Sequence, residues 1–320
     1  MIIGGTGFFG KCILDAFARG LLKSWSITRL VVMSRNSQAL LQACPQLVGR
    51  GVELMTADIT DVQALPEADY VIHAAASTDV RDYLSKGIQE KRNIQAGTYN
   101  YCELAKKFHQ KSKIVYVSSG AVYGVQPESM NQIDEEFLAS DMINMDAGKL
   151  DYAIAKQDAE QAVKKLGASG LNVSIARCFA FVGAWLPRDR HFAIGNFIGD
   201  ITNKRPIIVK AKHKVYRSYM YADDLVEWLM TLADFASTKA PVYNVGSDES
   251  ILVGDLANKL AEVYHVQAVI PLITESKIDR YIPSIKKAKV DLGLYLKYNL
   301  DSSIRETMKK IESINEKMKK

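Results

Sequence analysis

The chain has 320 residues, 48% of them hydrophobic, and a formal net charge of +5, which is enough apolar material for one large α/β domain or two smaller ones. No uninterrupted apolar run approaches the roughly 18 residues of a membrane span, and no signal peptide precedes Gly4, so we expect a globular cytoplasmic protein. The four cysteines and five histidines are scattered without metal or redox spacing, which predicts buried thiols and no metal site.

A glycine-rich turn follows the apolar start of the chain. Gly4, Gly7 and Gly10 precede a predicted helix at 11–19, so a strand, a tight turn and a helix N-terminus meet at one point. Backbone N–H groups and the helix dipole attract a pyrophosphate there, which predicts a Rossmann-type dinucleotide site. The first strand, at 1–3, is shorter than the roughly five residues usual for a strand, which leaves open a truncated or misassigned start.

Strands and helices alternate through the next part of the chain. Runs rich in apolar and β-branched residues predict strands at 30–34, 52–56, 70–73, 113–118 and 172–177. Apolar residues at helical spacing predict further helices at 88–109 and 152–166. This alternation is typical of an α/β fold in which helices cover both faces of a doubly wound parallel sheet.

After these elements the alternation becomes irregular, with Pro-, Gly- and aromatic-bearing segments and one strand-like run at 242–246. We therefore expect a smaller, irregular α/β substrate-binding lobe formed by residues 179–215 and 247–320. The dinucleotide-binding Rossmann domain is expected to comprise residues 1–178 together with roughly 216–246.

The end of the chain is rich in lysine, and its apolar residues keep helical spacing at Ile304, Met308, Ile311 and Ile314. This pattern predicts a surface helix with a solvated basic face rather than a nucleic-acid patch. The mild basicity of the whole chain suits anionic small ligands.

Tyr152 is the only one of the fifteen tyrosines with a lysine, Lys156, four residues further on. On a helix these two side chains share one face. A neighbouring cation stabilises a phenolate, so the pair predicts a tyrosine that exchanges protons near neutral pH. Together with the glycine turn and with Ser118 and Ser119, about thirty residues earlier, the pair indicates a redox active site.

In this order the motifs resemble those of the extended short-chain dehydrogenases/reductases, in particular the NAD(P)-dependent nucleotide-sugar epimerase/dehydratase family, nearly from end to end. The matching segments beyond the glycine turn and the Tyr152–Lys156 pair are 58–61, 73–76, 93–98, 117–124 and 217–224. The resemblance implies a homodimer that acts on a nucleotide-diphosphate sugar, with no nucleic-acid or membrane partner. It also implies catalytic roles for Ser119, which bonds the reacting oxygen, for Tyr152, which moves the proton, and for Lys156, which also binds the nicotinamide ribose.

The resemblance further implies a set of binding residues. Those for the cofactor are Gly4, Gly7, Phe8, Phe9, Gly10, Ser34, Arg35, Asp58, Ile59, Ala74, Ala75, Ala76, Asn93, Lys156 and Phe179. Those for the substrate are Thr78, Ser119, Asn196 and Arg217. Arg217 is expected to hold the diphosphate, because its planar fork suits phosphate in a way that a lysine cannot copy.

The choice between NADP and NAD depends on the end of the second strand. NAD enzymes usually carry a carboxylate about twenty residues past the glycines, but this chain has Ser34 and Arg35. An arginine there accommodates a 2′-phosphate, so NADP is favoured over NAD. The alternative is that Arg35 stacks on the adenine.

Two departures from the family pattern bear on the reaction. Gly120 and Ala121 follow Ser119, where the 4,6-dehydratase branch has an acidic pair, so elimination of water is not expected. Ala180 stands where many epimerases have an asparagine, which puts that substrate contact in doubt.

Three functions stay open at this point. The first is a C4 oxidoreductase of a nucleotide sugar, either an epimerase or a net 4-ketoreductase. The second is an NADPH-dependent reductase of a small non-sugar ketone. The third is a non-catalytic NAD(P)-sensing protein, although such proteins tend to lose the tyrosine or the lysine that this chain retains.

Overall fold

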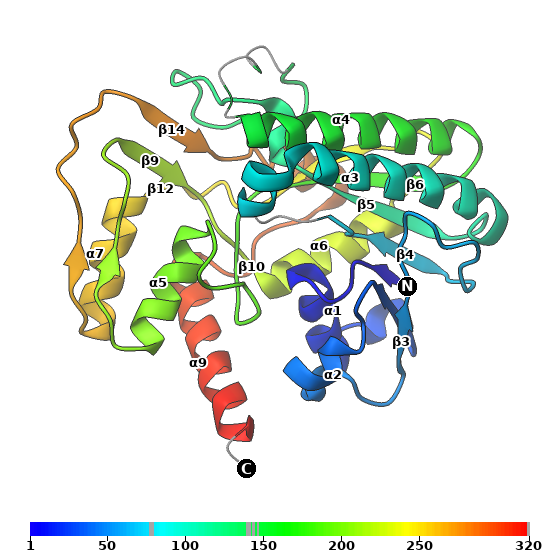
Figure 1. Ribbon diagram of the computed structural model, residues 1–320, viewed down its shortest axis with the longest axis horizontal. Coiled ribbons are helices and arrows are strands. Elements are labelled where there is room, and N and C mark those ends of the chain that lie inside the picture. Colours follow the sequence, from blue (N-terminus) through cyan, green and yellow to red (C-terminus); the bar gives the residue numbers. More distant parts are fainter. Residues whose placement is uncertain (77–79, 139–141, 143–144, 146, 319–320) are drawn as a thin grey trace. The chain divides into compact units, whose positions relative to one another are not determined.

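The computed structural model describes residues 1–76, 80–138, 142, 145 and 147–318. The chain forms two compact units, which are described separately (Figure 1). The first comprises Met1–Gly124, Ala139–Cys178 and Val226–Asn244. The second comprises Val125–Leu138, Phe179–Leu225 and Val245–Lys320.

A seven-stranded sheet is the centre of the first unit, and its strands have the order β11-β6-β5-β4-β1-β2-β3. The strands are β1 (Ile2–Ile3), β2 (Leu30–Ser34), β3 (Val52–Thr56), β4 (Tyr70–His73), β5 (Lys113–Ser119), β6 (Asn172–Cys178) and β11 (Val242–Val245). Every neighbouring pair from β3 to β6 is parallel. The predicted doubly wound α/β fold is therefore confirmed, and β5 and β6 each run one residue beyond the prediction because Ser119 pairs in register with Cys178.

Helices cover both faces of this sheet (Figure 1). They are α1 (Phe8–Ala18), α2 (Ala39–Ala43), α3 (Val80–Phe108), α4 (Ala147–Ala168) and most of α6 (Ala222–Asp234). The short 3-10 helices are η1 (Lys23–Trp25), η2 (Pro45–Leu47) and η3 (Gly120–Tyr123). Three helices begin earlier than apolar periodicity predicts, α1 by three residues, α3 by eight and α4 by five.

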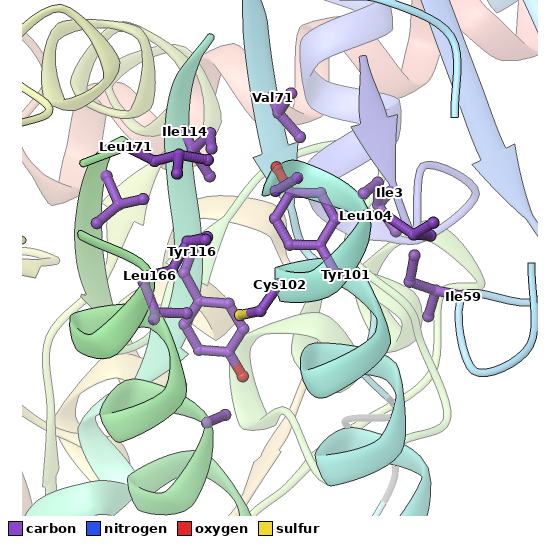
Figure 2. Close-up of a cluster of buried hydrophobic side chains, with 14 of the residues drawn as sticks. Ile3, Ile59, Val71, Tyr101, Cys102, Leu104, Ile114, Tyr116, Leu166 and Leu171 are labelled. Carbon is purple, nitrogen blue, oxygen red and sulfur yellow. The ribbon is translucent and has the colours of Figure 1, made fainter. Parts of the chain in front are cut away.

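One buried hydrophobic cluster of this unit lies between the sheet and the pair α3 and α4. Figure 2 shows Tyr101, Cys102 and Leu104 of α3 pointing toward strand residues such as Tyr116. All of these side chains are at most 7% exposed. The strands supply near-continuous apolar runs, as expected for a parallel sheet covered on both faces.

The second unit is built from three small sheets and four helices in the described part of the chain. The sheets are β7 (Phe181–Val182) with β10 (Met220–Tyr221), β8 (Ile207–Ile208) with β13 (Ala268–Val269), and β9 (Lys214–Arg217) between β12 (Ile251–Leu252) and β14 (Ile278–Tyr281). The helices are α5 (Ala193–Thr202), α7 (Val253–Tyr264), α8 (Lys286–Leu292) and α9 (Leu300–Met318). The last of these is the helix predicted from the apolar spacing near the end of the chain.

Residues 125–138 belong to the second unit, although they lie inside the range 1–178 that was assigned to the first domain from sequence. The reason is a backbone connection to the segment after β14. The Ile133 N–H donates to the Ile282 carbonyl at 2.9 Å, and the Ser284 N–H donates to the Ile133 carbonyl at 2.7 Å. The Gln126 side chain also accepts the Ile282 N–H, at 3.0 Å.

Candidate active site

The segments that follow β1, β2, β3, β4 and β5 all leave the sheet at its carboxyl edge. Because β1 lies between β2 and β4, the chain crosses from one half of the sheet to the other at this strand. Ligands of open α/β sheets bind outside the carboxyl ends of the strands at such a crossover point. Most of the predicted cofactor residues, from Gly4 to Ala76, lie on these segments.

Two glycines of the first turn are required by close packing within the protein. Gly4 has a φ of +83°, and a Cβ on it would lie 2.6 Å from the Ala75 Cα. A Cβ on Gly10 would lie 2.0 Å from the Gly5 carbonyl oxygen. The turn therefore packs tightly against the segment after β4, with Ala75 beside Gly4.

Gly7 is different, because the protein leaves room for a side chain there. It is exposed, and a Cβ on it would meet only the Gly4 carbonyl oxygen, at 3.5 Å. Gly7 is also the N-cap of α1, whose first turn contains no acidic residue. An accessible helix N-terminus without a carboxylate fits a pyrophosphate, and a side chain at Gly7 would stand in its way.

The neighbouring loops present further predicted cofactor residues. At the end of β2, Arg35 is exposed, and the Ser34 Oγ is buried with no hydrogen-bond partner in the described residues. After β3, the Asp58 carboxylate accepts the Thr60 N–H at 3.0 Å. The Ile59 side chain belongs to the buried core and is 8% exposed.

Asn100 of α3 was not predicted from sequence, although it holds the loop after β3. Its side-chain amide donates to the carbonyls of Ile59 and Val62, both at 2.9 Å. By contrast, the predicted Asn93 bonds to Gln89 and Glu90 of its own helix. The only sequence signal for Asn100 was a polar residue among the apolar positions of a predicted helix. That signal does not indicate which backbone groups the side chain binds.

Of the remaining predicted residues in this unit, Phe8 and Phe9 are half-buried at the start of α1, with their ring centroids 5.8 Å apart. Ala74 and Ala76 are half-buried after β4. Thr78 lies outside the described residues.

Ser119, Tyr152 and Lys156 come together from two elements, β5 and α4. Ser119 ends β5, and its Oγ accepts the Ala121 N–H at 3.2 Å. A hydrogen bond joins the Ser119 and Tyr152 side chains. Lys156 lies one helical turn beyond Tyr152, with its Nζ 5.9 Å from the centre of the Tyr152 ring.

Lys156 is buried, with 2% of its surface exposed. Its ammonium donates to the Val117 carbonyl of β5 at 2.8 Å and to the Tyr116 hydroxyl at 3.4 Å. Burial lowers the pKa of Lys156 to about 8, and the Cys178 thiol and the Glu160 carboxylate oppose this shift. The lysine is thus poised to release its proton in mildly alkaline solution.

The pKa of Tyr152 moves in the direction opposite to the sequence prediction. Burial raises it to about 12, and the hydrogen bond with Ser119 lowers it only in part. The predicted lowering by Lys156 is not found, because the lysine directs its proton donors to Val117 and Tyr116 rather than to the Tyr152 hydroxyl. Tyr152 therefore keeps its proton at neutral pH in this arrangement.

A buried ion pair beneath these residues was not predicted from sequence. The Glu160 carboxylate accepts the Ser118 hydroxyl at 2.6 Å and the Arg177 Nη2 at 2.8 Å. Its side chain is 3% exposed and that of Arg177 is 13% exposed. The Arg177 guanidinium stacks over the Tyr123 ring at 4.7 Å. Glu160 follows Lys156 by four residues, so the sequence could have placed it on the same helix face. The sequence could not have shown that Glu160 pairs with Arg177.

His73, at the end of β4, is buried between aromatic rings. Its ring centroid lies 4.9 Å from that of Tyr101 and 5.5 Å from that of Tyr116. Burial and then the charge of Lys156 lower its pKa to about 3, and the nearby backbone of His73 and Gly97 offsets part of the shift. His73 is therefore a neutral packing residue at physiological pH.

The other predicted binding residues lie in the second unit. Arg217 ends β9, and its guanidinium forms a bidentate ion pair with Asp279, with a shortest contact of 2.8 Å. Asn196 of α5 donates to the Arg190 carbonyl, and its Oδ1 is buried with no partner in the described residues. Phe179, predicted to meet the cofactor, packs on Tyr281 with ring centroids 4.7 Å apart.

The described residues contain no group of three or more His, Cys, Asp or Glu side chains arranged to hold a metal ion. None of the helices in the same residues has both the length and the apolar composition of a membrane span. The four cysteines are free and buried, as predicted.

Comparisons with known proteins place this geometry in context. Residues 1–246 match the profile of the NAD dependent epimerase/dehydratase family. Similar curated proteins include UDP-glucuronic acid decarboxylase 1 of Arabidopsis thaliana, 25% identical over 303 residues, and UDP-glucose 4-epimerase of Mycoplasma pneumoniae, 29% identical over 231 residues. These alignments cover 94% and 70% of this chain but only 66% and 63% of the two relatives, so the chain spans about two thirds of their length.

Among solved structures, the UDP-glucose 4-epimerase of Thermotoga maritima with UDP-glucose is similar, with a TM-score of 0.77. The identity is 18%, and the match covers 98% of both chains. This likeness shows that the two proteins share a fold.

The buried pair of Glu160 and Arg177 yields a prediction about stability. Glu160→Gln leaves the Arg177 charge buried without its counter-charge, which should cost about 3–5 kcal/mol of unfolding free energy. Glu306→Gln is the matched control, because Glu306 pairs with Lys309 at the surface of α9 and should cost well under about 1 kcal/mol. Urea unfolding of both variants measures the difference, and equal losses would contradict the role of the buried pair.

The lowered pKa of Lys156 yields a prediction about pH. Below about pH 8 the ammonium is charged in both the folded and the unfolded chain, so the cost of burying it is fully present. Between about 8 and the ordinary value of 10.5, the folded chain has released this proton while the unfolded chain still holds it, so stability rises with pH. Lys156→Met should lack this gain, which is at most about 3 kcal/mol.

Unfolding free energies of the wild type and Lys156→Met at pH 7 and pH 10 check this prediction. The advantage of the wild type over the variant should grow with pH, whereas a difference that is the same at both values would show that Lys156 does not titrate in this range.

Proposed function

Because the chain belongs to the NAD-dependent epimerase/dehydratase family, we propose that it is an oxidoreductase acting on a nucleotide-activated sugar at C4. The observation that carries the proposal is the hydrogen-bonded pair of Ser119 and Tyr152, with the buried Lys156 one turn away, beside the carboxyl edge that bears the glycine turn. Such a hydroxyl pair can move a proton on and off a sugar oxygen.

Each residue of the triad has a role that follows from its surroundings. Tyr152 keeps its proton at neutral pH, so it can donate that proton to an oxygen that gains charge. Ser119 bonds the same oxygen and orients it. Lys156 places its Nζ 5.9 Å from the centre of the Tyr152 ring without lowering the pKa of Tyr152, so we assign it the other role that the resemblance implies, binding of the nicotinamide ribose. The nicotinamide, when bound, supplies the acceptor and donor of hydride.

Two reactions fit this chemistry, an epimerase that oxidises and re-reduces C4, and a net 4-ketoreductase. Net consumption of reduced cofactor with a 4-keto sugar nucleotide distinguishes them. A 4,6-dehydratase is not proposed, because Gly120 and Ala121 after Ser119 offer no carboxylate for the elimination of water.

We assign dinucleotide binding to the first unit and substrate binding to the second. The glycine turn, Arg35 and the Ser119–Tyr152 pair belong to the first unit, and Asn196 and Arg217 to the second. The Asn196 Oδ1, buried without a partner in the described residues, suits contact with a substrate hydroxyl. A cytoplasmic homodimer is part of the proposal: the four buried thiols suit a reducing compartment, and the family resemblance suggests the dimer.

For the cofactor we propose NADP, although the family is described by NAD. Support comes from the exposed Arg35 at the end of β2, where a carboxylate would repel a 2′-phosphate. The Ser34 Oγ beside it also has no hydrogen-bond partner in the described residues.

A reductase of a small non-sugar ketone is the second candidate, and one observation favours it. The Nη1/Nη2 edge of Arg217, the proposed ligand of the diphosphate, is already paired with Asp279, so only the Nε/Nη2 edge is left for a phosphate. Turnover of non-nucleotide ketones, without binding of nucleoside diphosphates, would support this candidate.

The test of the catalytic proposal is Tyr152→Phe, which removes the proton donor. It should lower kcat by several orders of magnitude and leave the Kd for the cofactor nearly unchanged. Mass spectrometry of ligands that co-purify with the protein identifies the nucleotide sugar for the assay. Tyr99→Phe, which removes an exposed hydroxyl on α3, is the control and should retain full activity. Near-normal turnover in Tyr152→Phe would overturn the catalytic assignment.

The test of the cofactor proposal is Arg35→Ala. It should weaken NADP binding by about 1.5–3 kcal/mol, roughly tenfold to a hundredfold, and barely change NAD binding. Fluorescence titration with both reduced dinucleotides measures this, and an equal loss for the two would indicate that Arg35 stacks on the adenine instead.

A further inference from the structure

Arg217 has most of its hydrogen-bond donors engaged within the protein. Its Nη1 donates to the Tyr216 carbonyl at 2.8 Å and to the Asp279 Oδ1 at 3.1 Å, and its Nη2 donates to the Asp279 Oδ2 at 2.8 Å. A guanidinium has five N–H groups. Two therefore have no acceptor in the described part of the chain, the Nε–H and the second Nη2–H, and these two lie along one edge of the planar group.

The backbone around this pair is held on both sides. Arg217 lies opposite Ile251 of β12 in an antiparallel pairing and opposite Tyr281 of β14 in a parallel pairing. Figure 1 shows β9 with β12 and β14 beside it. Asp279 lies two residues before Tyr281, on the same face of β14. Both partners of the ion pair thus project from paired strands rather than from loops.

The consequence is an arginine with a fixed orientation. Its side chain is 24% exposed and that of Asp279 is 33% exposed, so the pair is accessible to a ligand but partly shielded from water. The Asp279 carboxylate binds the Nη1/Nη2 edge of the guanidinium. The Nε/Nη2 edge remains for two oxygens of an anion. The exposed Lys210 and Lys212 precede β9 and add positive charge to this part of the chain, whereas Lys214 lies on the face of β9 opposite to Arg217.

We propose that Asp279 is a positioning residue for the diphosphate of the substrate, because it fixes Arg217 so that the Nε/Nη2 edge receives the phosphate oxygens. The inference rests on the proposed function, since it takes the ligand of Arg217 to be a nucleoside diphosphate. The direction in which neutralising Asp279 changes the affinity for the diphosphate distinguishes positioning from simple repulsion. A carboxylate near an anion repels it, so simple electrostatics predicts tighter binding when Asp279 is neutralised, whereas positioning predicts weaker binding.

The experiment is isothermal titration of the full chain with UDP and with dTDP. The proteins are the wild type, Asp279→Asn, Arg217→Ala and the double variant. Asp279→Asn should weaken nucleoside diphosphate binding by about tenfold, because Arg217 loses its fixed orientation. In the Arg217→Ala background the same substitution should have no weakening effect, because the residue through which Asp279 acts is absent.

Two further variants make the result specific to the pair. Asp279→Glu keeps the charge but moves the carboxylate, so it should also weaken binding, and it provides the test if Asp279→Asn fails to fold. Arg280→Met is the matched control, because Arg280 is the next residue of β14, points to the other face and stacks over the Tyr216 ring at 4.4 Å. It should change the Kd by less than about twofold, since that face does not carry the proposed contact.

Steady-state kinetics separates positioning from a general structural effect. Asp279→Asn should raise KM for the nucleotide sugar and leave kcat unchanged, as expected when a binding contact alone is lost. Unchanged or tighter binding in Asp279→Asn, a loss that persists without Arg217, or a wild type that binds neither UDP nor dTDP would each overturn the inference.

These experiments distinguish failure of the proposed function from failure of the inference about Asp279. A chain that shows these binding changes but no hydride transfer would retain the role of Asp279. A chain that converts nucleotide sugars but is insensitive to Asp279→Asn would lose this inference alone.

Discussion

The attachment of α4 to the end of β5 is the interaction on which the candidate site depends. Lys156 binds the Val117 carbonyl, Gln157 donates to the Val122 carbonyl at 2.8 Å, and Glu160 accepts the Ser118 hydroxyl. These contacts hold the helix that carries Tyr152 against the strand that carries Ser119. In the proposed reaction a displacement of about 1 Å between proton donor and reacting oxygen would be costly, so the proposal depends on this attachment.

Burial then determines the charge of the groups that meet there. The same dry surroundings raise the pKa of Tyr152 from 10.0 to about 12 and lower the pKa of Lys156 from 10.5 to about 8, which moves the two values apart. At neutral pH Tyr152 is therefore neutral and Lys156 is charged. Glu160 contributes to this balance as well as to the packing, since its carboxylate favours the charged form of Lys156.

In both units, contacts within the protein hold groups that were proposed to bind an anion. In the first unit the packing of Gly4 and Gly10 sets the shape of the turn, and Gly7 leaves the N-terminus of α1 accessible. In the second unit the Asp279 carboxylate binds the Nη1/Nη2 edge of Arg217 and so limits the orientation of its guanidinium. Orientation fixed before a ligand arrives reduces the entropy that binding must offset.

The sequence by itself determined the elements whose signals are local. Short runs rich in apolar and β-branched residues predicted the strands of the sheet. Glycine spacing predicted the turn before α1, and the four-residue spacing of Tyr152 and Lys156 placed both on one face of α4. Periodicity and turn chemistry act over a few residues, so they can be read without knowing the fold. The same locality explains why the predicted strands agree with the structure more closely than the helix ends do.

Only the tertiary structure decided which distant residues meet. Glu160 and Arg177 are 17 residues apart, Arg217 and Asp279 are 62 apart, and residues 125–138 join the second unit through Ile282. The pKa direction of Tyr152 also required the structure, because it depends on burial and on where the Lys156 ammonium points. Partner choice and burial are properties of the folded chain as a whole, and no local pattern encodes them.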